Sequence, residues 1–156
     1  WLRTLPATTV FADALFLCHG DLFDSPHLLE QVTPSGVFLR STPAIETSVV
    51  GIAQPVILCG HSHVPRTVAL PSGKLIINPG SLGLPAYTEE TVGETPILHS
   101  MESGSPHARY AILHRARDEW QVEHIQIPYD WNQAAYVART NQRSDWAEWI
   151  STGRAR

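Results

Sequence analysis

Two short apolar segments, each ending in a cysteine and followed at once by histidine and glycine, constrain this sequence more than any other feature. Residues 14–18 (ALFLC) precede His19, and residues 56–59 (VILC) precede Gly-His-Ser-His at 60–63. Short apolar runs bounded by glycine or proline are typical of strands buried inside a sheet. In open α/β sheets, active sites lie just beyond the carboxyl ends of such strands. The sequence therefore predicts an α/β fold that brings both segments to one sheet edge.

The remaining elements follow from local signals. A hairpin is expected over 66–78 around a Pro-Ser-Gly turn, and a second hairpin from the strands 108–115 and 120–127. Prolines and capping residues predict five helical segments. The end of a helix is expected at 1–6 and a helix over 26–32. Three further helices are expected to begin at a cap: a short one at Thr42, one of about 10 residues at Asp130 and a last one at Ser144. The stretch 84–106, rich in Pro, Gly, Ser, Thr and Glu, predicts a long surface loop.

Charge and hydropathy argue against several classes of protein. The 156 residues carry 11 basic and 15 acidic side chains, a net charge of −4, which is unfavourable for binding nucleic acid or a membrane surface. No apolar run approaches the roughly 20 residues of a spanning helix. Cys18 and Cys59 are too few for a disulfide framework, and both are expected to be buried, reduced thiols. We therefore expect a cytoplasmic protein without nucleic-acid or membrane partners.

His19, His61 and His63 are the candidate metal ligands. In extended backbone, residues two apart point to the same side, so His61 and His63 can face one site while Ser62 turns away. His19 joins them if the two strands are parallel neighbours. Imidazole binds Zn, Fe, Mn or Ni, and the alternatives are hydrogen-bonded loop histidines or a single metal held by all three rings.

A third polar segment, Asn-Pro-Gly-Ser at 78–81, follows the last strand of the first hairpin. Glycine at position 80 lets the backbone approach a ligand closely, and the side chains of Asn78 and Ser81 can bond a phosphate oxygen. Asn78, Gly80 and Ser81 are therefore candidate substrate-side residues, with an ordinary turn as the alternative.

The other histidines lack placement at a strand end. We expect surface or hydrogen-bonded structural roles for His27, His99, His107, His114 and His124. Trp131, Trp146 and Trp149 are expected on a helix face that packs on the sheet. Arg66 and Arg109 could reach a phosphate, but each is one of ten arginines.

Taken together, these blocks resemble the C-terminal half of the calcineurin-like metallophosphoesterases, in particular the small bacterial branch with GHTH-like and NPGS-like motifs. The matching segments are LFLCHGD, PVILCGHSHVPRTVALPSGKLIINPGSLGLPAY and ARYAIL, in the family's order. The resemblance covers residues 1–128 and leaves out a helical tail at 129–156. It implies half of a four-layer αββα sandwich, with a mixed sheet and flanking helices, in a single domain over 1–156 that is truncated at its N-terminus.

The resemblance also implies a function, the hydrolysis of phosphomonoesters or phosphodiesters by a water that bridges two divalent cations (Mn, Fe, Zn or Ni). By its pattern, His19 and His61 bind one cation and His63 binds the other. The loop at 78–81 would lie beside a small phosphate-ester substrate. The substrate itself and the metal's identity stay open.

The sequence departs from the family pattern upstream of His19, where the DxH, GDxxD and GNHD or GNHE motifs are missing. Asp21 and Asp24 lie in a stretch that formally spells GDxxD, but it follows the expected place of GNHD, and we interpret it as chance. The bridging carboxylate and the general acid are therefore expected in a missing N-terminal half. Three imidazoles alone should hold two cations poorly, because like charges need anionic ligands between them.

Two expectations follow from this incompleteness. The chain alone should have little or no phosphoesterase activity, and the alternative function is that of a degenerate, non-catalytic binding domain. A half-sheet also leaves a strand edge unpaired, so we expect a homo-oligomer or pairing with the missing half.

Overall fold

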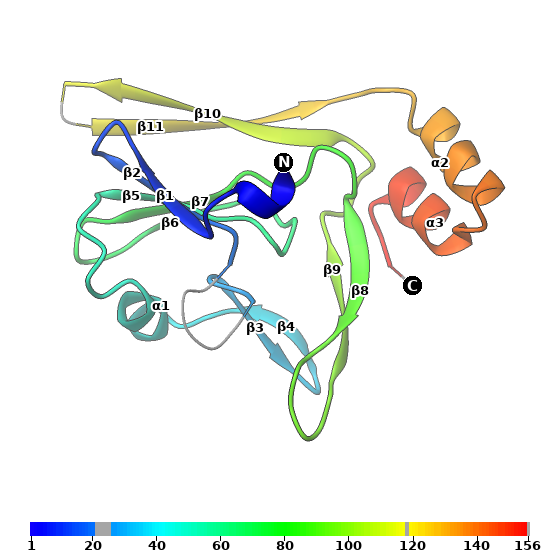
Figure 1. Ribbon diagram of the computed structural model, residues 1–156, viewed down its shortest axis with the longest axis horizontal. Coiled ribbons are helices and arrows are strands. Elements are labelled where there is room, and N and C mark those ends of the chain that lie inside the picture. Colours follow the sequence, from blue (N-terminus) through cyan, green and yellow to red (C-terminus); the bar gives the residue numbers. More distant parts are fainter. Residues whose placement is uncertain (21–25, 118, 156) are drawn as a thin grey trace.

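A five-stranded mixed sheet organises the structure, a computed structural model that describes residues 1–20, 26–117 and 119–155 (Figure 1). The strand order is β1-β2-β5-β7-β6. Its central strands run parallel, namely β2 (Leu15–Cys18), β5 (Val56–Leu58) and β7 (Leu75–Asn78). The outer strands, β1 (Thr8–Phe11) and β6 (Arg66–Ala69), pair antiparallel with them. The predicted α/β class with a mixed sheet is confirmed, as is the predicted hairpin of β6 and β7.

Three separate hairpins surround this sheet (Figure 1). They are β3 (Glu30–Thr33) with β4 (Gly36–Leu39), β8 (Ala86–Glu90) with β9 (Leu98–Glu102), and β10 (Ala108–Ala116) with β11 (Glu119–Ile127). The hairpin β10–β11 was predicted, whereas the other two correct the expectations for their segments.

The helix predicted at 26–32 and the surface loop predicted at 84–106 are both wrong. Residues 30–39 are a strand pair that turns between Thr33 and Gly36. Along β9, His99 and Met101 are buried while Leu98 is 68% exposed. This alternation is the period of a half-buried strand, which the polar composition of the segment concealed.

The helices lie at two ends of the molecule (Figure 1). They are α1 (Thr42–Ser48), α2 (Trp131–Thr140) and α3 (Ser144–Thr152), besides a short 3-10 helix, η1 (Leu2–Thr4), where the end of a helix was expected. The side chain of Asp130 caps α2 as predicted, by accepting a hydrogen bond from the backbone N–H of Gln133. The cap positions of α1 and α3 are Ser41 and Arg143, one residue earlier than predicted.

The main core lies between α1 and the sheet. Ile57 and Ile76 of the central strands are fully buried in one cluster with Ile45 and Val49 of α1. At the other end, Trp149 of α3 packs with Ala86 of β8 in a second cluster. Cys59 is buried and Cys18 half-buried, and no disulfide joins the two. None of the described helices is long and apolar enough to cross a bilayer.

Candidate metal centre

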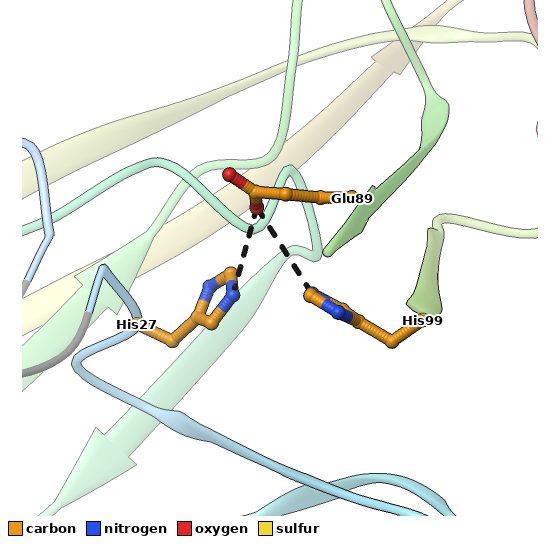
Figure 2. Close-up of side chains that lie close together, drawn as sticks. All are labelled: His27, Glu89 and His99. Carbon is orange, nitrogen blue, oxygen red and sulfur yellow. Dashed lines mark ion pairs between the residues drawn. The ribbon is translucent and has the colours of Figure 1, made fainter. Parts of the chain in front are cut away.

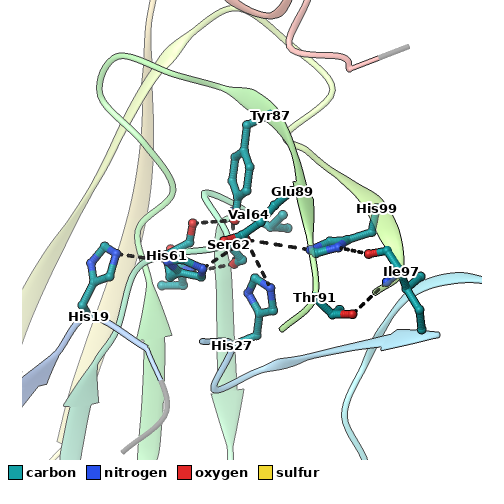
Figure 3. A network of polar contacts seen from close by, with 11 residues as sticks. His19, His27, His61, Ser62, Val64, Tyr87, Glu89, Thr91, Ile97 and His99 are labelled. Atoms are coloured by element: carbon teal, nitrogen blue, oxygen red, sulfur yellow. Dashed lines mark hydrogen bonds and ion pairs between the residues drawn. The ribbon is translucent and has the colours of Figure 1, made fainter. Parts of the chain in front are cut away.

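Two of the predicted ligands meet at the carboxyl edge of the sheet. His19 follows β2 and His61 follows β5, and the parallel pairing of these strands places their ends side by side. His19 Nε2 lies 3.2 Å from His61 Nδ1, and the ring centroids are 5.1 Å apart (Figure 3). The sequence-based expectation that these two side chains converge agrees with this geometry.

The backbone that carries His61 and His63 is a tight turn. Both residues have positive φ angles, 63° and 59°, so the extended conformation expected for this segment is wrong. The N–H of Ser62 donates to the carbonyl of Gly60 at 2.8 Å, and the Ser62 side chain is fully buried. Left-handed backbone is uncommon outside glycine, and surrounding contacts must hold it in place.

Asn78, at the end of β7, supplies those contacts. Its Nδ2 donates to the carbonyl of Gly60 at 2.8 Å and to Ser62 Oγ at 3.0 Å, and its Oδ1 accepts from the N–H of Gly80 at 3.0 Å. Asn78 is fully buried, so its side chain positions the histidine turn from inside the protein. A direct contact between this amide and a substrate does not fit such burial.

The rest of the loop at 78–81 is also packed from inside. Gly80 has a φ of 88°, and a Cβ there would press on the side chain of Arg109. Ser81 Oγ accepts a hydrogen bond from the backbone N–H of Leu84 at 3.1 Å. A substrate-side role for Gly80 and Ser81 stays a prediction.

His63 lies beside Tyr87 rather than against His19. Its Nδ1–H donates to the carbonyl of Leu84 at 2.7 Å, which leaves the lone pair on Nε2 for a ligand. The Tyr87 ring is 5.0 Å from the His63 ring and 6.4 Å from the His61 ring. Burial lowers the pKa of His63, and burial together with His61 lowers the pKa of His19. Both rings are therefore neutral near pH 7, the form in which imidazole binds metals.

Glu89 of β8 brings a carboxylate that the sequence interpretation missed. Its Oε2 lies 3.4 Å from His61 Nε2, 3.9 Å from His27 Nε2 and 4.0 Å from His99 Nε2 (Figures 2 and 3). His27 and His99 are only 3% and 6% exposed, so surface roles are excluded for both. Burial, with His61 and His99 nearby, lowers the pKa of His27 to about 4. The sequence held one signal for the buried position of His99. Exposed and buried residues alternate along 98–102, and this alternation puts His99 on the buried face with Met101.

A pocket of about 340 Å³ adjoins His61 and His63. The helical tail outside the family resemblance closes it through Arg143, Trp146 and Trp149. Arg143 pairs with Asp145 at 2.7 Å, and its guanidinium lies 4.4 Å from the Trp146 ring centre. The pocket thus combines aromatic walls with a cation next to the histidine turn. Trp149 packs with Ala86 of the β8 hairpin, Trp131 packs against Ala147 and Ile150 of α3, and Trp146 is 38% exposed. The three tryptophans therefore do not share one helix face that packs on the five-stranded sheet.

The two candidate arginines have structural partners. Arg66 Nε donates to Glu30 Oε1 at 3.1 Å, and Glu30 is buried. Arg109 is buried too, and its Nη2 donates to Ser105 Oγ at 2.8 Å and to the carbonyl of Ser103 at 3.3 Å. These contacts hold both guanidinium groups against other parts of the protein, and neither contact supports a role in binding phosphate.

The other histidines behave as expected. His107 Nδ1 lies 3.2 Å from Ser105 Oγ, His124 Nε2 lies 2.8 Å from Thr67 Oγ1, and His114 is exposed on β10. Asp21 and Asp24 fall outside the described residues.

Comparison with one solved structure agrees with this architecture. A solved metallophosphoesterase from Sphaerobacter thermophilus superposes with a TM-score of 0.63 and 18% identity, covering 98% of this chain and 61% of that one. Vacuolar Protein Sorting 29 from Cryptosporidium parvum gives a TM-score of 0.36 and 15% identity, over 80% of this chain and 58% of its own. A Vps29 single mutant from Entamoeba histolytica gives a TM-score of 0.37 and 16% identity, over 81% of this chain and 63% of its own.

No protein-family model matches this sequence, and no curated protein matches it either. At 18% identity, the likeness to the Sphaerobacter protein establishes the fold alone. This chain therefore shares the fold of a metallophosphoesterase and spans 61% of that structure's length.

Proposed function

We propose that the protein is a metal-dependent phosphoesterase and that this chain supplies part of its centre for two divalent cations. The observation that supports this most is the 3.2 Å approach of His19 Nε2 to His61 Nδ1 at the sheet edge, in a fold shared with a metallophosphoesterase. Two imidazoles that converge from separate strands form a chelating pair suited to Mn, Fe, Zn or Ni.

The donor atoms fit such cations. His19 and His61 would hold one cation and His63, oriented through Leu84, the other. When bound, the cations would offset the charge of the phosphoryl oxygens and acidify a water for attack on phosphorus. Tyr87 donates its hydroxyl hydrogen to the carbonyl of His61 at 2.9 Å and so helps to hold the histidine turn during turnover.

The substrate we propose is a small phosphate ester. Its phosphate would face the histidines, and its organic group would enter the 340 Å³ pocket between Tyr87 and the two tryptophans of α3. Burial raises the pKa of Tyr87, so its hydroxyl stays protonated and keeps a hydrogen to donate. Further carboxylate ligands and the general acid would come from chain upstream of Trp1.

The coding DNA upstream of Trp1 gives the first test. An in-frame segment with DxH, GDxxD and GNHD supports the phosphoesterase, and a stop codon there favours a non-catalytic binding domain. The second test measures hydrolysis of bis(p-nitrophenyl) phosphate with Mn²⁺ by the protein extended with that segment. We expect hydrolysis by the extended protein, loss in His61→Ala and no change in His114→Gln, whose imidazole is exposed on β10.

The 156-residue chain alone should hydrolyse little or no ester, because its predicted ligand set is incomplete. Mn²⁺-dependent hydrolysis by this chain, abolished by His61→Ala, would contradict that expectation. An extended protein that binds Mn²⁺ and hydrolyses neither monoesters nor diesters would refute the proposed function itself.

A further inference from the structure

We propose that His27, Glu89 and His99 form a separate site for one zinc ion, beside the pair of His19 and His61. None of these three residues matches a motif of the resembling family, and none was expected to carry chemistry. The inference goes beyond the proposed phosphoesterase centre because it assigns different ligands.

The three side chains converge from separate segments. His27 precedes β3, Glu89 lies on β8 and His99 lies on β9, and Figure 2 shows both rings directed at the Glu89 carboxylate. One ligand atom from each residue lies within 4.8 Å of the others. A tetrahedral zinc holds neighbouring ligand atoms about 3.3 Å apart, so each histidine nitrogen needs to approach the carboxylate by less than about 1 Å.

The spacing is too wide for direct hydrogen bonds and fits an intervening cation. Glu89 Oε2 is 3.9 Å from His27 Nε2 and 4.0 Å from His99 Nε2, beyond the roughly 3.2 Å of an N–H···O bond. Neither Glu89 Oε2 nor His99 Nε2 has a hydrogen-bond partner among the described residues, although both atoms are buried. A buried polar atom without a partner costs about 1–3 kcal/mol, and a bound cation would remove that cost.

The orientation of His99 also suits a ligand. Its Nδ1 lies 3.2 Å from the carbonyl of Ile97, which can only accept, so Nδ1 carries the proton (Figure 3). The lone pair is then on Nε2, which faces Glu89. A backbone carbonyl that fixes the second nitrogen in this way is the usual support of a metal-bound histidine.

The ligand types select the ion. Two imidazoles and one carboxylate are a zinc-binding set, whereas Ca²⁺ and Mg²⁺ prefer oxygen ligands throughout. His61 Nε2 lies 3.4 Å from the same carboxylate oxygen, so the two proposed sites adjoin each other at the sheet edge.

The test measures zinc binding by the purified protein after treatment with a chelator. Bound zinc is counted by mass spectrometry of the metal, and affinity is measured by competition with a chromophoric chelator. We expect His99→Gln and Glu89→Gln each to weaken one zinc site by about 100-fold or more, because each removes a ligand. His19→Ala and the exposed control His114→Gln should leave that site unchanged.

Equal zinc affinity in the unaltered protein, His99→Gln and Glu89→Gln would overturn the site. Zinc lost in His19→Ala but kept in His99→Gln would also overturn it, and would assign the metal to the proposed phosphoesterase centre instead. Circular dichroism of the metal-free variants separates loss of a ligand from loss of the fold. The visible bands of Co²⁺ bound in place of zinc should change in Glu89→Gln, which is isosteric, and an unchanged spectrum counts against the proposal.

Discussion

A network of buried polar residues holds the turn that carries His61 and His63. Asn78 bonds Gly60 and Ser62, and Glu30, which is 2% exposed, pairs with Arg66 at 3.1 Å. Ser62 also hydrogen-bonds Glu30, which links the two pairs. Such a network rigidifies a site when every member has a partner and destabilises it when one partner is lost.

Replacing Asn78 by alanine tests this network. The change removes all three hydrogen bonds of the Asn78 amide and leaves the N–H of Gly80 without its acceptor. The Gly60 carbonyl keeps the bond from the Ser62 N–H, and Ser62 Oγ keeps Glu30, so we expect unfolding free energy to fall by about 2–3 kcal/mol. Urea denaturation followed by circular dichroism measures the loss. Ser81→Ala, which removes only local loop bonds, should cost less than about 1 kcal/mol. Equal losses in the two variants would show that Asn78 has no special supporting role.

Replacing Arg66 by methionine gives a pH-dependent prediction. Burial raises the pKa of Glu30 above its ordinary 4.5 even with Arg66 beside it. A carboxyl whose pKa is raised by folding contributes most stability below the unfolded pKa, and this contribution is lost as pH rises through the folded pKa. Arg66→Met raises that pKa further, so we expect a loss of about 2 kcal/mol at pH 7.

That loss should shrink as the pH is lowered towards 4.5, where Glu30 becomes protonated and needs no cation. Denaturation midpoints of both proteins, measured from pH 4.5 to 7.5, check the trend. A deficit that is constant with pH would mean that Arg66 acts through packing alone.

At the scale of elements, the hairpin β8–β9 and the helix pair α2–α3 complete the site. The hairpin brings Glu89 and His99 to His61, and α3 fixes the hairpin because Trp149 packs with Ala86. The chemistry at the sheet edge therefore depends on two elements that lie outside the sheet. Substitutions of the tryptophans of α3 can test how far the fold and the pocket each depend on these two elements.

Trp149→Ala and Trp146→Ala form a matched pair for this purpose. Trp149 is 8% exposed, and its truncation should lower unfolding free energy by about 3–4 kcal/mol through the cavity it leaves. Trp146, at 38% exposed, should cost less than about 1 kcal/mol but weaken binding of substrates with an organic group, because it lines the pocket. Thermal and urea unfolding compare the two, and a larger loss in Trp146→Ala would disprove the packing argument.

At the scale of the whole molecule, the sheet has two edges, β1 and β6. On β1, Val10 and Phe11 are 46% and 64% exposed. An exposed edge with apolar side chains is a template for pairing with another chain. We expect β1 to pair with a second copy of this chain.

Light scattering at rising protein concentration measures this association. Val10→Lys should reduce it, because a charged side chain on an edge strand opposes pairing. Glu94→Lys, in the turn between β8 and β9, is a control that adds a lysine away from the edge. A soluble monomer at every concentration would rule out self-association through β1.

Local signals along the chain were enough to predict several of the strands and one helix start. Continuous apolar runs predicted β2 and β5, turn residues predicted the hairpins β6–β7 and β10–β11, and Asp130 marked the start of α2. The convergence of His19 and His61 also followed from the sequence, because polar residues after parallel strands share one edge.

The remaining features depend on how distant segments pack together. The left-handed turn at 61–63 depends on Asn78, which reaches it from the end of another strand. The cluster of His27, Glu89 and His99 joins three segments far apart in the chain, and none of them carries a local pattern that points to the others. A local pattern reports the conformation of its own segment, whereas the partners of a buried polar side chain are set by how the segments pack together.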